Sequence, residues 1–241
     1  MIKTAVIMAA GVGSRFGTMT ESQPKGFIKV GGVSMIKRSI ETLIKCGIEK
    51  IIIGTGYKHE MYDVLSAEYP QIVCVYNQQY ATTNSMWTLW NCAQEIGADD
   101  FLLLESDLIF EKRAIEELLL CKENNVILGS NVIKFQDSYF LEVDNKGFLV
   151  NCSLKKNELK VCGELVGINK ISSSYFKLLH DYYSRIKCEK PKMGYEFAIL
   201  NLAKKFHNVN VLILCNLIWY EIDDADDLKF AESNIINLID E

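Results

Sequence analysis

The stretch KTAVIMAAGVGSRFG, residues 3–17, decides the fold of this chain. It begins with an apolar run, Thr4 to Ala10, which has no polar alternation and therefore predicts a strand buried on both faces of a parallel sheet. The run ends in Gly11-Val12-Gly13-Ser14-Arg15, and a glycine-rich turn after a strand directs backbone N–H groups at an anion. Arg15 can form bidentate hydrogen bonds to phosphate oxygens, and Lys25 can approach them as a point charge. The residues alone also allow an ordinary strand-to-helix turn with a surface arginine and lysine.

Two common phosphate-binding loops do not fit this turn. The chain has no G-x-x-x-x-G-K-[ST] motif, and Phe16 stands where a dinucleotide fingerprint has its third glycine. Instead, A-A-G-x-G-S-R-F with P-K-G-F at residues 24–27 resembles the signature of nucleotidyltransferases, which join an NTP to a phosphorylated small molecule and release pyrophosphate. The resemblance implies that Arg15 and Lys25 are catalytic and stabilise the α-phosphate and the leaving group. It also implies a triphosphate-binding loop made of Ala9, Ala10, Gly11, Gly13 and Ser14.

Length and composition narrow the class of protein. We expect one domain, residues 1–241, because an α/β chain of this length commonly forms a single core. The net charge of −5 argues against nucleic acid as a partner, and no apolar stretch approaches the roughly 18 residues of a membrane-spanning helix. The eight cysteines form no C-x-x-C pair, and the N-terminus enters a strand without room for a signal peptide. We therefore expect a cytoplasmic protein without disulfides, zinc or membrane insertion, whose oligomeric state stays open.

Strands and helices alternate over residues 4–76, which predicts a parallel sheet with right-handed crossovers. Ligands of such sheets gather beyond the carboxyl ends of the strands, where several polar residues of this chain are expected. A hydroxyl-rich segment at 82–85 opens a helix there, and a helix cap without a ligand is its alternative interpretation. The residues expected to contact the nucleotide outside the glycine loop are Thr55, Gly56, Asn77, Thr82, Thr83, Ser85 and Ser106.

Acidic residues end a second apolar strand, Phe101–Leu104, which runs into Glu105-Ser106-Asp107. A carboxylate at the tip of a central strand requires a cation or hydrogen-bond donors, and Mg²⁺ commonly takes one or two protein carboxylates together with phosphate oxygens. Asp107 is therefore predicted to bind Mg²⁺, with a structural helix cap as the alternative. The resembling family pairs such an aspartate with one from a late E-I-D segment, which implies Asp223 as the second ligand.

The strand order changes in the section of about 130–200, where we expect a small β lid that binds the acceptor. Short strands are predicted at 126–129, 139–143 and 148–153, with a hairpin turn at 144–147. A primary ammonium is best held by carboxylates, whereas a quaternary one prefers an aromatic box. Each acid in this section is also compatible with a solvated surface group. The residues expected to bind the acceptor are Glu142, Lys155, Glu164, Tyr195, Glu196 and Trp219.

The motifs I-G-T-G-Y, L-L-L-E-S-D-L-I, G-E-L-V-G-I and W-x-E-I-D together are most similar to the 2-aminoethylphosphonate cytidylyltransferase family. The resemblance implies an α/β fold, a three-layer α/β/α sandwich of the nucleotide-diphospho-sugar transferase (GT-A-like) type with a mostly parallel twisted sheet. It implies transfer of CMP from CTP to 2-aminoethylphosphonate, with Mg²⁺ as cofactor and pyrophosphate as product. The alternatives are phosphocholine as acceptor, another sugar-phosphate-type nucleotidyltransferase, or a nucleotide-binding regulatory protein, which would need neither Asp223 nor an acid-lined lid.

Overall fold

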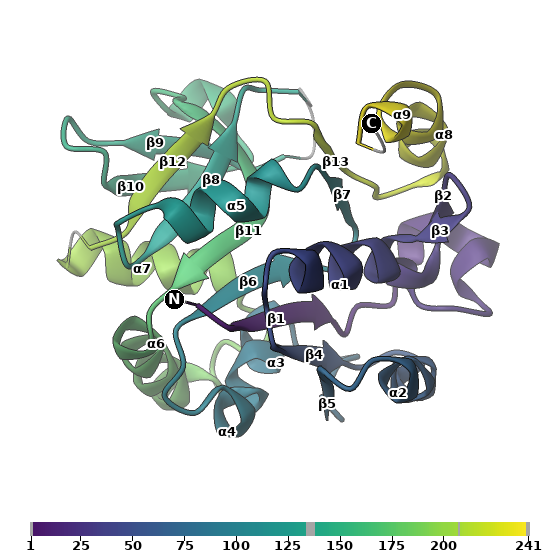
Figure 1. Ribbon diagram of the computed structural model, residues 1–241. Coiled ribbons are helices and arrows are strands. Elements are labelled where there is room, and N and C mark those ends of the chain that lie inside the picture. The colour runs from purple at the N-terminus through teal and green to yellow at the C-terminus, as the bar shows by residue number, and fades with distance from the viewer. Residues whose placement is uncertain (1, 134–137, 207, 240–241) are drawn as a thin grey trace.

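The N-terminal apolar run forms β1 (Thr4–Ala9) in the middle of a large sheet, in a computed structural model that describes residues 2–133, 138–206 and 208–239 (Figure 1). β1 pairs in parallel with β4 (Lys50–Thr55) on one side and with β6 (Phe101–Glu105) on the other. β4 pairs in parallel with β5 (Ile72–Tyr76). The carboxyl ends of these four strands therefore share one edge of the sheet, as the sequence predicts.

The sheet continues beyond β6 with strands of both directions. β11 (Gly163–Ile171) is antiparallel to β6 and also pairs with β8 and β9, so that the described residues form a nine-stranded sheet. The strands predicted as a small lid thus extend the central sheet, and the turn at 144–147 joins two of them as predicted. The remaining strands of this half are β8 (Val126–Ser130), β9 (Phe140–Val143), β10 (Leu149–Ser153) and β12 (Asn210–Leu214).

Helices cover both faces of the sheet, which gives three layers. Successive side chains of a strand point to opposite faces, and in β1 Ile7 packs with one set of helices while Val6 packs with the other. The first set is α1 (Met35–Lys45), α2 (His59–Glu68) and α5 (Arg113–Leu120). The second set is α3 (Ser85–Asn91), α4 (Ala93–Ile96), α6 (Ser173–Ile186) and α7 (Tyr195–Phe206). None of the helices in the described part of the chain has the length and apolarity to cross a membrane.

A third apolar cluster joins distant parts of the chain. It contains Phe16 of the loop, Ile222, and Ile236 near the C-terminus. Two elements outside the main sheet contribute to it: the hairpin of β2 (Lys29–Val30) with β3 (Val33–Ser34), and the ribbon of β7 (Leu108–Phe110) with β13 (Trp219–Glu221). The closing helices are α8 (Ala225–Asn234) and α9 (Ile236–Ile239), which Figure 1 shows beside the β2–β3 hairpin. The sequence did not reveal β7, which separates Asp107 from α5.

Candidate active site

A cleft of about 610 Å³ opens at the carboxyl edge of the sheet, between the end of β1 and the antiparallel strand β11. A second cavity of about 360 Å³ adjoins it over the glycine-rich loop. The two cavities share Arg15, Asp107 and Asp223 among their lining residues. The two cavities therefore adjoin at these charged residues.

The glycine-rich loop is held in shape by its own backbone and by one buried threonine. Gly13 has φ +69°, a conformation that side chains disfavour, and its carbonyl accepts hydrogen bonds from the Phe16 amide and the Thr20 hydroxyl. A Cβ at Gly13 would lie 3.0 Å from Cβ of Lys25, because the loop packs directly against the segment that carries this lysine. The loop shape therefore also sets the position of Lys25.

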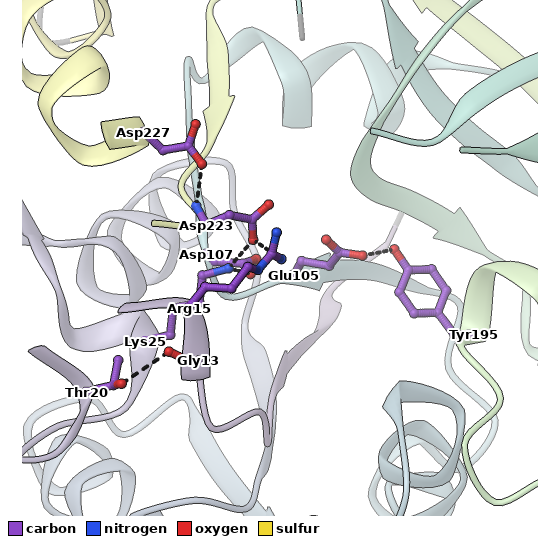
Figure 2. Close-up of polar contacts among 9 residues, drawn as sticks. All are labelled: Gly13, Arg15, Thr20, Lys25, Glu105, Asp107, Tyr195, Asp223 and Asp227. Atoms are coloured by element: carbon purple, nitrogen blue, oxygen red, sulfur yellow. Dashed lines mark hydrogen bonds and ion pairs between the residues drawn. The ribbon is translucent and has the colours of Figure 1, made fainter. Parts of the chain in front are cut away.

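Four charged side chains meet at the junction of the two cavities (Figure 2). The Lys25 ammonium donates to Asp107 Oδ2 at 2.5 Å and to Asp223 Oδ1 at 2.6 Å. Arg15 Nη2 donates to the same Asp223 oxygen at 2.7 Å. Burial alone would lower the pKa of Lys25, but the two carboxylates raise it above its ordinary value. Lys25 is therefore charged at neutral pH, and together with Arg15 it balances the charges of the two acids.

The β7–β13 ribbon brings the two aspartates together although they lie far apart in the sequence. Glu221 pairs with Leu108 in the register of the ribbon, and the Ile222 amide donates to the Asp107 carbonyl at 3.0 Å. Asp107 and Asp223 thus flank the same end of the ribbon and face Lys25. This pairing therefore brings the two acids, which the resemblance implied as a pair, to one place.

Two further glutamates, which the sequence analysis did not assign, join Asp107. One carboxylate oxygen from each of Glu105, Asp107 and Glu221 lies within 4.8 Å of the others. Asp107 Oδ1 is buried and has no hydrogen-bond partner among the described residues. Hard carboxylate oxygens with a free coordination position are the donor set that Mg²⁺ takes, so these residues fit the cofactor expected from the sequence. The signal in the sequence was the repeated E-x-D at 105–107 and 221–223, which places a second carboxylate two residues before each predicted metal ligand.

Glu105 is enclosed by groups from three elements. Burial raises its pKa well above its ordinary value, and the neighbouring charges of Glu221 and Asp107 add to this shift. The Tyr195 hydroxyl donates to Glu105 Oε1 at 2.7 Å and opposes it. Gly167 of β11 has φ +82°, and a Cβ there would lie 3.0 Å from Glu105 Oε2. Only glycine allows the β11 backbone to pass this carboxylate without displacing it.

Of the residues expected to bind the acceptor, Tyr195 and Glu196 line the larger cleft. Burial raises the pKa of Glu196 above its ordinary value. The structure does not bring the other four to the cleft lining. Glu164 is buried and accepts a hydrogen bond from the Ile133 amide at 2.6 Å, while the Trp219 indole donates to Ser130 at 2.8 Å. The remaining two are Glu142 and Lys155, the latter paired with Glu158 on the surface.

The residues expected to bind the nucleotide divide into two groups. Those that line one of the two cavities are Ala10, Gly11, Gly13, Ser14, Thr83, Ser85 and Ser106. Those that do not line them are Ala9, Thr55, Gly56, Asn77 and Thr82. The buried Asn77 amide donates to the hydroxyls of Thr83 and Thr88, so it supports the cleft wall from behind. Lining residues that were not assigned a contact from the sequence include Tyr80, Tyr139 and Asn84, although Asn84 belongs to the polar segment 82–85.

Comparison with known proteins gives a family match and several distant relatives. Residues 5–131 match the family described as MobA-like NTP transferase domain. A CMP-5'-(3-aminopropyl)phosphonate synthase of Streptomyces rubellomurinus is 25% identical over 95% of this chain and 38% of its own length. A choline-phosphate cytidylyltransferase of Haemophilus influenzae is 24% identical over 92% of this chain and 93% of its own. A 2-aminoethylphosphonate cytidylyltransferase of Lancefieldella rimae is 32% identical over 46% of this chain and 45% of its own.

A solved structure of similar shape is that of the CTP:phosphocholine cytidylyltransferase from Streptococcus pneumoniae. It superposes with a TM-score of 0.82 at 22% identity and covers 96% of this chain and 99% of its own. The likeness confirms the predicted fold class. The present chain spans less than half the length of two of the three relatives above.

Proposed function

Since this chain belongs to the MobA-like NTP transferase family, we propose that it transfers CMP from CTP to 2-aminoethylphosphonate and releases pyrophosphate. The observation that carries the acceptor is Glu196, a carboxylate that lines the larger cleft and lies outside the acidic cluster of Glu105, Asp107 and Glu221. Carboxylates in a shielded cleft are the groups that best bind a primary ammonium. The phosphonate end of such an acceptor then points toward the positive charges of Arg15 and Lys25.

In the proposed reaction a phosphonate oxygen attacks the α-phosphorus of CTP while the bond to pyrophosphate breaks. The acceptor is already anionic at neutral pH, so the protein supplies position and charge rather than a general base. Arg15 and Lys25 stabilise the charge that develops on the α-phosphate and the leaving group. Before it can do so, Lys25 must exchange the carboxylates of Asp107 and Asp223 for phosphate oxygens.

Asp107, Glu105 and Glu221 would hold Mg²⁺, with Asp223 next to them across Lys25, and the ion when bound would supply positive charge to the triphosphate. The glycine-rich loop would bind the β- and γ-phosphates through its backbone amides. Lys25 and Arg15 balance the charges of the two aspartates in the described structure, so Lys25 would become available to the phosphates when another cation pairs with these acids.

Phosphocholine is the second candidate acceptor. The relative from Haemophilus influenzae, which matches over nearly its whole length, is a choline-phosphate cytidylyltransferase. In addition, Tyr139 and Tyr195 both line the larger cleft, and aromatic faces attract quaternary ammonium groups. The Tyr195 hydroxyl donates to Glu105. The neighbouring residue Glu196 would then supply the negative charge for a quaternary ammonium group.

The test measures pyrophosphate release with Mg²⁺ and CTP for four acceptors: 2-aminoethylphosphonate, 3-aminopropylphosphonate, phosphocholine and ethylphosphonate. We expect 2-aminoethylphosphonate to give the highest kcat/KM. Ethylphosphonate should be at least about tenfold poorer, because it leaves buried carboxylates without their cation. Higher kcat/KM with phosphocholine would replace the acceptor and keep the cytidylyl transfer. No pyrophosphate with any acceptor, under CTP, UTP, ATP or GTP, would refute the transferase proposal.

A further inference from the structure

The backbone of Asp223 lies where β13 has ended and α8 has not yet begun, so neither element fixes it. Its amide donates a hydrogen bond to Asp227 Oδ2 at 2.9 Å, and its own carboxylate points to Lys25 and Arg15 (Figure 2). Asp227, one helical turn after Asp223, therefore holds the backbone that carries the Asp223 side chain.

The second oxygen of the Asp227 carboxylate is used as well. Asp227 Oδ1 accepts from the Tyr220 hydroxyl at 3.0 Å, and Tyr220 lies in β13 opposite Ile109 of β7. One carboxylate thus ties the strand before Asp223 to the helix after it. Tyr220 and Ile109 belong to the same apolar cluster as Phe16 of the glycine-rich loop. Through Asp227 and Tyr220, the position of Asp223 is therefore linked to that of the loop.

Asp227 is itself anchored at the start of α8. Asp224 is the N-cap of this helix, and its Oδ1 accepts from the amides of Asp226 and Asp227. Asp227 does not line either cavity, so it acts through Asp223 and not on a ligand. Its neighbour Asp226 has the same charge in the same helical turn, but its side chain is 92% exposed and pairs with Lys229. The chain therefore offers a matched control.

We propose that Asp227 is a positioning residue for the metal–nucleotide site: it fixes the Asp223 backbone so that the Asp223 carboxylate faces Lys25 and Arg15, next to the acids that would hold the metal. The proposal rests on the proposed nucleotidyl transfer for its kinetic consequence. It does not rest on the acceptor. A helix-capping role alone would change stability without changing how the site binds metal and nucleotide.

The test compares Asp227→Ala, Asp227→Asn and Asp226→Ala with the wild type. Asparagine can accept from the Asp223 amide with its oxygen and donate to the Tyr220 oxygen with its nitrogen, so it keeps the geometry without the charge. We expect Asp227→Ala to lower kcat/KM about ten- to hundredfold, as small displacements of catalytic groups do, while Asp227→Asn stays within about threefold and Asp226→Ala is unchanged.

A second readout uses no turnover: binding of Mn²⁺, followed by its electron paramagnetic resonance signal, alone and with each of CTP, UTP, ATP and GTP. We expect at least about tenfold weaker Mn²⁺ binding in Asp227→Ala and near-normal binding in Asp227→Asn. Tyr220→Phe removes only the hydrogen bond from the Tyr220 hydroxyl to Asp227 and is expected to weaken Mn²⁺ binding about threefold. This variant replaces Asp227→Ala in the test if Asp227→Ala does not fold.

Three results would overturn the proposal. The first is normal Mn²⁺ binding in Asp227→Ala with only a lower melting temperature or, should that variant not fold, normal binding in Tyr220→Phe. The second is an equal loss in Asp227→Ala and Asp227→Asn. The third is the absence of Mn²⁺ binding in the wild type under all conditions. If Mn²⁺ binding follows the expected order but no nucleotide supports pyrophosphate release, the positioning role holds and the proposed function fails.

Discussion

Replacing Lys25 with methionine should destabilise the protein without its ligands, and the structure gives the magnitude. Both aspartate oxygens contact the same ammonium, so they lie no more than about 5 Å apart, and their side chains are only 19% and 5% exposed. At an effective dielectric constant of about 20, two such charges repel by about 3 kcal/mol. This agrees with the usual cost of removing one partner of a buried ion pair. For a chain of this length, about 3 kcal/mol corresponds to a fall in Tm of roughly 6–12 °C.

The assay is thermal unfolding with and without millimolar Mg²⁺. In Lys25→Met we expect a larger Mg²⁺-induced rise in Tm than in the wild type, because the metal no longer competes with the ammonium for the two carboxylates. Turnover should fall at least about a hundredfold, since the charge at the reacting phosphate is lost. The control is Lys3→Met, which breaks the exposed pair with Glu49 and should change Tm little. An unchanged Tm in Lys25→Met, or a Mg²⁺ increment no larger than that of the wild type, would refute the reasoning.

Asp107→Asn and Asp223→Asn should each reduce Mg²⁺-dependent turnover at least about a hundredfold, and the double variant should be little worse if both act on one ion. Steady-state rates across a Mg²⁺ series check this, and multiplicative losses would mean separate roles. Gly167→Ala places a Cβ 3.0 Å from a glutamate oxygen of the cleft and should lose activity, whereas Gly147→Ala has a similar φ but open space and should change only the urea midpoint. The pKa of Glu196 is raised by burial, so its charge, and with it kcat/KM for 2-aminoethylphosphonate, should increase as pH rises through that pKa. Glu196→Gln should cost about ten- to hundredfold and flatten the pH profile, while a loss equally large with ethylphosphonate would argue against an ammonium contact.

The glycine-rich loop and the strand that precedes it could be predicted because their signals are local. A continuous apolar run, two glycines and an arginine occupy a dozen consecutive residues, and the structure forms β1 and the loop where they were expected. The E-x-D repeat at 105–107 and 221–223 is equally local, because each glutamate stands two residues before a predicted metal ligand.

The acceptor residues were harder to predict because burial decides what an acid does. Glu164 lies in an apolar strand between glycines, a pattern that fits a carboxylate in a binding site as well as one that holds a loop. In the structure it is fully buried and bound to the Ile133 amide. Trp219 likewise fits an aromatic box by residue type, but its indole packs in the core against Ser130. Whether Glu164 and Trp219 face the cleft or the core depends on the register of β11 and β13, which no local sequence pattern fixes.

The ribbon that joins Asp107 to Asp223 has three residue pairs and lies outside the nine-stranded sheet. Two-stranded ribbons are weak by themselves, and local opening requires far less free energy than unfolding of a buried sheet. If the ribbon opens, the two acids separate, while the strands of the core keep their hydrogen bonds. The temperature or urea concentration at which activity is lost is therefore set by this short ribbon rather than by the core. Activity should disappear while the circular dichroism of the fold is still unchanged.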